Sequence, residues 1–148
     1  MIGISIGDAN GVGPEILLMA FKNGKLSGDF MAIGDFSVLN YCNTYVNIGV
    51  PLRRMTNVED CKTGFLNIYD AGILSEKDIM MGRLSEKTGY ASLKYVEIGT
   101  QLALKKHIDA LVTLPINKEA IRATEPDFSG HTGYIASLCH TKNYTMML

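Results

Sequence analysis

The chain has 148 residues, the length of one ordinary domain, and 47% of them are hydrophobic, which is enough for a sizeable core. Its 14 Lys and Arg residues nearly balance its 15 Asp and Glu residues. A chain without a basic excess lacks the electrostatic field that holds a nucleic-acid backbone or an anionic membrane, so we expect neither partner.

The cysteines and the amino terminus bear on the compartment. Cys42, Cys61 and Cys139 form no C-x-x-C pair, and an odd count favours reduced thiols over a disulfide framework or a zinc site. The apolar residues 1–6 have no basic flank and are soon followed by Asp8, so they do not fit a signal peptide. No apolar run has the length of a membrane span. We therefore expect a cytoplasmic protein.

Short apolar runs alternate with longer helical patterns along the chain, which is typical of an α/β fold with a mostly parallel sheet and crossover helices. The predicted strands are residues 2–6, 30–33, 51–55, 65–69, 110–114 and 144–148. Pro14 suits the first helical position and predicts a helix through "EILLMAF", which is apolar nearly all round. A second helix is predicted from residue 36 to about residue 48.

The longest predicted helix runs from Ser85, a suitable N-cap, to Lys106. Its polar side chains fall in one arc and leave the remaining face apolar or small, so we expect most of the helix to be covered. Gly89 and Gly99 lie on that covered face, where they would let another backbone approach closely, in the same chain or in a second subunit.

Two motifs suggest a short-chain dehydrogenase. "GDANGVG" after the first strand has the glycine spacing of that family's cofactor turn, and "YASLK", from Tyr90 to Lys94, has its Y-x-x-x-K spacing. The segment between them is too short for the intervening βα units, since each parallel crossover takes about 30 residues. We therefore favour a solvated Lys94. For the glycines, a plain strand-to-helix turn and an anion-binding turn both stay open, whereas Pro14 excludes a P-loop.

Polar residues follow two of the predicted strands, at the edge of a parallel sheet where ligands bind. Asp8 follows the first strand, and Asn117 with Lys118 follows "ALVT" in the stretch "LPINK". In "SGHTGY", His131 and Thr132 offer convergent hydrogen-bonding groups for a small polar ligand, although a loop histidine bonded to backbone is equally compatible.

The other two histidines are weaker candidates. His107 follows two lysines at a helix end, which favours a surface role. His140 adjoins Cys139, but adjacent side chains point apart and no third metal ligand is near in the sequence.

Taken in order, a set of motifs resembles the 4-hydroxythreonine-4-phosphate dehydrogenase family of pyridoxal phosphate biosynthesis. The motifs are "ISIGDANGVGPEI", "GRLSEKTGYASLKYVEIGTQLA", "DALVTLPINKEAI", "FSGHTGYIA" and "YTMML". The usual forms in that family are G-D-P-A-G-I-G-P-E, G-P-I-N-K and G-H-T-E. This chain departs from them at Ala9 and Asn10, at Leu114 and at Gly133.

The resemblance implies a fold like isopropylmalate dehydrogenase, with helices on both sheet faces, two domains, a homodimer and a shared cleft. It implies oxidation of 4-phosphohydroxy-L-threonine with NAD or NADP and a divalent metal, then decarboxylation to 3-amino-2-oxopropyl phosphate. His131 and Thr132 would bind the phosphorylated substrate, and Lys118, Asn117 and Asp8 would line the cleft.

Family chains are about twice as long, so residues 1–148 are expected to be a truncated, amino-terminal part, with the metal ligands beyond Leu148. Such a part would be inactive alone. Two alternatives stay open: a paralogue acting on 4-phosphorylated erythronate or threonate, and a non-catalytic binding or assembly domain.

Overall fold

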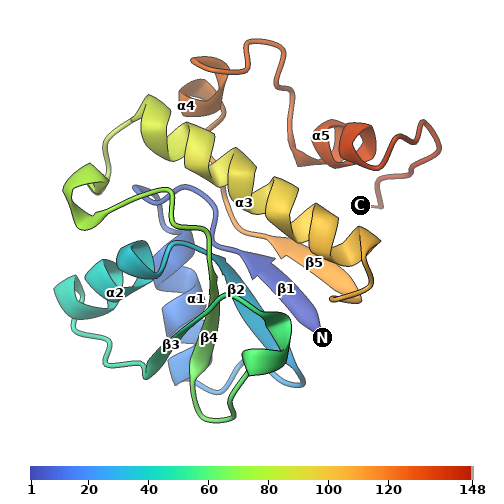
Figure 1. Ribbon diagram of the computed structural model, residues 1–148. Coiled ribbons are helices and arrows are strands. Elements are labelled where there is room, and N and C mark those ends of the chain that lie inside the picture. Colours follow the sequence, from blue (N-terminus) through green and yellow to red (C-terminus); the bar gives the residue numbers. More distant parts are fainter. Residues whose placement is uncertain (148) are drawn as a thin grey trace.

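The computed structural model describes residues 1–147 and contains a five-stranded sheet in which every pair of neighbours is parallel (Figure 1). The strand order is β3-β4-β2-β1-β5. The elements, in chain order, are β1 Ile2–Ser5, α1 Gly13–Lys22, β2 Phe30–Gly34, α2 Phe36–Tyr45, β3 Leu52–Met55, the 3-10 helix η1 Val58–Asp60, β4 Leu66–Asp70, the 3-10 helix η2 Glu76–Asp78, α3 Glu86–Leu104, β5 Ala110–Thr113, α4 Lys118–Arg122 and α5 His131–Leu138.

Helices cover both faces of the sheet, as expected. In Figure 1, α3 crosses the front of the sheet and α1 lies behind it. The chain moves in one direction across the sheet from β1 to β2 and in the opposite direction from β4 to β5. Because crossovers between parallel strands are right-handed, these two directions place α1 and α3 on opposite faces. The α/β prediction is confirmed.

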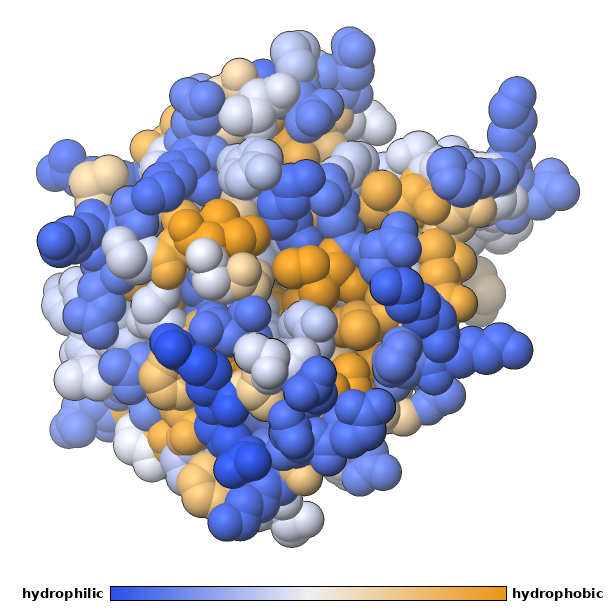
Figure 2. Space-filling model, viewed as in Figure 1, coloured by the Kyte–Doolittle hydropathy of each residue, from blue (hydrophilic) through white to orange (hydrophobic). Residues whose placement is uncertain are grey.

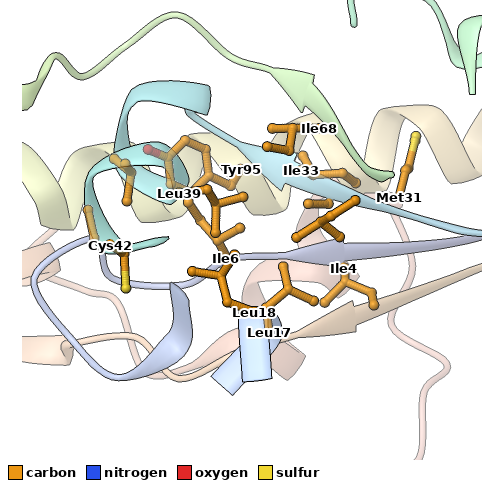
Figure 3. Packing of buried hydrophobic residues seen from close by; sticks show 14 of the residues in the cluster. Ile4, Ile6, Leu17, Leu18, Met31, Ile33, Leu39, Cys42, Ile68 and Tyr95 are labelled. Atoms are coloured by element: carbon orange, nitrogen blue, oxygen red, sulfur yellow. The ribbon is translucent and has the colours of Figure 1, made fainter. Parts of the chain in front are cut away.

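The core lies on both sides of the central strands (Figure 3). Leu17 and Leu18 of α1 pack below β1, and Tyr95 of α3 lies on the other side of β1. Burial raises the pKa of the Cys42 thiol to about 11, with a further increase from Glu15. All three cysteines are free thiols.

The predicted strands are confirmed apart from residues 144–148. Residues 144–147 form no strand and are all exposed, and residue 148 lies outside the described residues. An apolar run forms a strand only where a neighbouring strand can pair with it, and no strand of the sheet pairs with this segment. The second helix ends at Tyr45 instead of residue 48 because Asn47 and Gly49 have positive φ angles of 53° and 76°.

The prediction for α3 is confirmed in its main features. Ser85 is the N-cap residue, although its side chain makes no capping hydrogen bond, and half of the helix is buried. A Cβ on Gly89 would lie 2.5 Å from the carbonyl carbon of Ala120, so the backbone of α4 approaches there. Gly99 faces the sheet, where a Cβ would lie 2.5 Å from Leu111 Cδ1.

The surface on the α3 side carries hydrophobic patches separated by hydrophilic side chains (Figure 2). Across residues 1–147, the structure contains no helix that is both long enough and apolar enough to span a membrane.

Candidate functional site

The glycine turn after β1 is packed against the chain's own backbone. A Cβ on Gly7, whose φ is 73°, would lie 2.2 Å from the carbonyl oxygen of Pro115, and a Cβ on Gly13 would lie 2.1 Å from that of Ile6. The amide of Asp8 also donates to the Pro115 oxygen at 3.0 Å. The faces of Gly7 and Gly13 are therefore filled by the chain's own backbone, which leaves no space beside these two glycines for a dinucleotide.

Asp8 and Asn10 organise the same edge of the sheet. Asp8 is 5% exposed, and its Oδ1 accepts from the Asn10 amide at 3.1 Å. Asn10 accepts from the Met80 amide at 2.8 Å and donates from Nδ2 to the Arg83 carbonyl at 3.0 Å. The Asn10 side chain thus fixes the segment before α3, a role that the sequence analysis missed because the partners are distant in the chain.

The "LPINK" stretch positions Lys118 through the cap of α4. The side chain of Asn117 accepts from the amides of Glu119 and Ala120, at 3.0 and 3.1 Å. An asparagine N-cap of this kind fixes the first turn of a helix. Lys118 is the first residue of that turn and is exposed.

His131 and Thr132 begin helix α5 and do not lie in a loop. Gly130, with a φ of 153°, is the N-cap residue and turns the chain into the helix. Beside this turn lies a hollow of about 420 Å³, lined by Lys118, Ser129, Gly130, His131, Thr132 and Gly133. Tyr144 and Met146 of the carboxyl-terminal segment complete its wall.

The hollow is suited to an anionic, hydroxylated ligand. Nε2 of His131 is buried and has no hydrogen-bond partner among residues 1–147. Burial, and then the charge of Lys118, lower the pKa of His131, which favours the neutral ring at neutral pH. The first amides of a helix have no acceptor within the helix. Lys118 can therefore attract an anion while His131 and Thr132 hydrogen-bond to it.

A side-chain network ties α5 to α3. The hydroxyl of Tyr134 donates to Oε1 of Glu97, and Lys94 Nζ donates to the other oxygen of Glu97 at 2.6 Å. The Tyr134 ring packs edge-on against Phe128, with 5.7 Å between ring centroids. Lys94 also lies over the ring of Tyr90, 5.3 Å from its centroid. Glu97 thus links α5 to α3, and Lys94 of the "YASLK" motif is ion-paired with Glu97 on its own helix.

The structure brings together some of the predicted site residues. His131, Thr132 and Lys118 line one hollow, whereas the described lining of that hollow includes neither Asp8 nor Asn117. The sequence analysis missed Ser129 and the pair from the carboxyl-terminal segment. Only the glycine before His131 was a local signal for this turn. His107 is exposed, as its position after two lysines indicated, and His140 is exposed as well.

Residues 1–147 do not fit the divalent metal that the resemblance implies. No three His, Cys, Asp or Glu side chains in this part of the chain gather closely enough to hold an ion. Neither the metal nor the dinucleotide is therefore assigned to residues of this chain.

Comparison with known proteins identifies the family. The model of "Pyridoxal phosphate biosynthetic protein PdxA" matches residues 27–148. D-threonate 4-phosphate dehydrogenase of Cupriavidus necator is 33% identical over all of this chain and 45% of its own length. 4-hydroxythreonine-4-phosphate dehydrogenase of Sulfurihydrogenibium sp. is 32% identical over 99% of this chain and 45% of its own length.

A crystal structure shows the same fold. The 4-hydroxythreonine-4-phosphate dehydrogenase of Burkholderia phymatum has a TM-score of 0.88 and 31% identity over 96% of this chain and 44% of its own chain. This chain thus spans under half the length of the relatives it matches. The match of the family model across most of the sequence shows that the chain belongs to the PdxA family of pyridoxal phosphate biosynthetic proteins.

Proposed function

We propose that this chain is the amino-terminal part of a two-domain dehydrogenase subunit that oxidises a four-carbon acid phosphorylated at C4. The family match supports a dehydrogenase, and both relatives named above carry a 4-phosphate acid in their names. In this proposal the chain supplies part of the substrate site, and the residues that bind the nicotinamide cofactor and the metal lie elsewhere.

The observation that carries the proposal is the buried, unpartnered Nε2 of His131, a residue that lines one hollow together with Lys118 and Thr132. A buried polar atom without a partner is costly unless a ligand or water satisfies it. A substrate with hydroxyl and anionic groups would satisfy this nitrogen and meet the lysine charge together.

NAD or NADP and a divalent metal are part of the proposed reaction. When bound, the metal would polarise the hydroxyl that is oxidised and stabilise the enolate formed on decarboxylation. Residues 1–147 contain no metal-ligand cluster, and the faces of Gly7 and Gly13 are filled by backbone, so we propose that sequence outside this chain holds both groups and that the 148-residue chain alone turns over no substrate.

Two substrates are compatible with the family. With 4-phosphohydroxy-L-threonine, oxidation and decarboxylation would give 3-amino-2-oxopropyl phosphate for pyridoxal 5'-phosphate synthesis. The alternative is a 4-phosphorylated sugar acid, such as threonate or erythronate. The relatives with the two names are 33% and 32% identical to this chain, so overall identity does not separate the two substrates.

Binding by the chain itself tests the proposal. Either 4-phospho-D-threonate or 4-phosphohydroxy-L-threonine should shift the imidazole signals of His131 in an NMR titration. His131→Ala should weaken this binding at least about tenfold, the effect of losing one hydrogen bond to a charged ligand. His107→Ala, which changes an exposed histidine, is the matched control. The proposal fails if neither compound perturbs α5, or if both variants bind as the unmodified chain does.

A second function, binding or assembly without catalysis, is favoured by exposed hydrophobic side chains. Leu111 faces α3, so Val112 lies on the opposite side of edge strand β5, where it is 45% exposed. Val12 and Ile16 of the α1 region are 57% and 45% exposed. Such a surface suits a contact with another polypeptide, and we propose a homodimer for the intact subunit. Sedimentation of the chain and of Val112→Asp would test it: a monomer that is unaffected by the change contradicts this role.

A further inference from the structure

Gly133 occupies a helical position where this fold gives no reason for glycine. It lies inside α5, its φ is not positive, and a Cβ there would meet only Ser129 Oγ, at an ordinary 3.6 Å. Gly89, by contrast, has the backbone of α4 against it. Glycine inside a helix is destabilising relative to alanine. Something other than packing within residues 1–147 therefore accounts for the absence of a side chain at residue 133.

The missing side chain leaves room in the proposed substrate hollow. Gly133 lines the 420 Å³ hollow of His131 and Lys118, and also two adjoining hollows of about 360 and 550 Å³. Any longer side chain at residue 133 would project into this shared space, because the position is open to it. A ligand held by His131 would therefore lie close to the backbone of α5 at Gly133.

The His131 hollow itself is lined by a single charged residue. Among the described residues that line the His131 hollow there is no Asp or Glu, and Lys118 is the charged group. Lys142 lines the adjoining hollow on one side. Glu125 and Asp127 line the other adjoining hollow, and Glu125 acts on Lys94 and Tyr134, which belong to the α3 contact.

The two candidate substrates differ at C2, next to the carboxylate. 4-Phosphohydroxy-L-threonine carries an ammonium group there, and 4-phospho-D-threonate carries a hydroxyl group. An ammonium group beside Lys118 would be repelled and would find no carboxylate in the hollow. A hydroxyl group could instead hydrogen-bond to neutral His131 or to Thr132.

We propose that Gly133 determines substrate specificity by keeping both bulk and negative charge out of the hollow, so that it accepts the carboxylate end of a 4-phosphorylated hydroxy acid in preference to the amino acid. This inference rests on the proposed function. It commits the site to the threonate or erythronate class of substrate.

The test is an NMR titration of the 148-residue chain with 4-phospho-D-threonate and with 4-phosphohydroxy-L-threonine. The unmodified chain should bind the threonate about tenfold more tightly, which corresponds to a like-charge repulsion of about 1.4 kcal/mol. Gly133→Gln and Gly133→Glu are compared, because the two side chains have nearly the same volume and differ in charge. Both variants should fold, since the position has room for a side chain.

In Gly133→Gln, the added bulk should weaken binding of both compounds by a similar factor, so the ratio of the two affinities should stay the same. In Gly133→Glu, the ratio should move about tenfold towards the ammonium-bearing compound relative to the glutamine variant. Equal binding of the two compounds by the unmodified chain, or the same ratio in both variants, would overturn the inference while leaving the proposed function intact. Binding of neither compound by the unmodified chain would overturn the proposed function and this inference together.

Discussion

Replacing Tyr95 by phenylalanine should expose the dependence of the fold on one buried carboxylate. The Tyr95 hydroxyl donates to Oδ2 of Asp35 at 2.5 Å, and both residues are 0% exposed. Asp35 also accepts from the amides of Ile73 and Leu74, at 2.7 and 2.9 Å. The carboxylate therefore connects the end of β2 to the segment after β4 and to α3.

The expected cost follows from the charge of the acceptor. A hydrogen bond to a charged group contributes about 1.5 to 3 kcal/mol, and water cannot replace the lost hydroxyl at a site with no exposure. The remaining amides keep Asp35 partly satisfied, so we expect a loss within that range and not a complete failure to fold. For a chain of this length, the melting temperature should fall by about 3 to 12 °C.

Urea unfolding of the unmodified chain and of Tyr95→Phe measures the loss directly. Tyr134→Phe is the matched control, because the Tyr134 hydroxyl also donates to a carboxylate, that of Glu97, whose side chain is 28% exposed. Water can solvate Glu97 after the change, so the control should lose only about 1 kcal/mol. A loss below about 0.5 kcal/mol in Tyr95→Phe, or equal losses in the two variants, would refute the reasoning.

Three further predictions follow from local geometry and charge. Gly89→Ala should lower the free energy of unfolding by about 1 to 3 kcal/mol, because the backbone of α4 must move. Gly133→Ala should raise the free energy of unfolding by up to about 1 kcal/mol, because alanine favours a helix and the position has room. Urea unfolding of both variants measures the difference. Burial raises the pKa of the Cys42 thiol to about 11, above the unfolded pKa of about 8.5. The stability that this thiol contributes is fully present below about pH 8.5 and is lost as pH rises towards about 11. The melting temperature of Cys42→Ala should therefore fall less steeply with alkaline pH than that of the unmodified chain. Lys118→Met should raise the pKa of His131 in an NMR titration, yet leave it below its usual range because burial remains; no change would place the lysine charge away from the ring.

The fold was predictable because its strands are apolar runs with a local signature. Buried parallel strands need no alternation, so "IGIS" and "FMAIG" stand out from the helices around them. The apolar run "ALVT" has the same signature, although it forms an edge strand that is only partly buried. The same signal fails for residues 144–147, which are apolar in part but have no strand beside them. Hydrophobicity thus indicates that a segment can pair, while pairing itself depends on neighbours that the local sequence does not contain.

The site was predictable only in part, for a related reason. Asn117 and Lys118 are fixed by a cap within their own helix turn, which is a local feature. The meeting of Lys118 with His131 depends on the path of the chain through residues 123–130. No periodicity in the sequence specifies that path, so the resemblance to a family, and not spacing, pointed to His131 and Thr132 together.

The opening turn shows how a local motif can mislead. In "GDANGVG", the glycine spacing matches a cofactor turn because both need backbone groups to pass closely. In this fold the group that passes Gly7 is the carbonyl of Pro115, more than a hundred residues away in the sequence. A glycine therefore indicates that something approaches the backbone, and only the folded chain shows what it is. A Cβ on Gly7 would clash with backbone, whereas a Cβ on Gly133 would meet only Ser129 Oγ at an ordinary 3.6 Å, and that contrast is why the second glycine points to a ligand and the first does not.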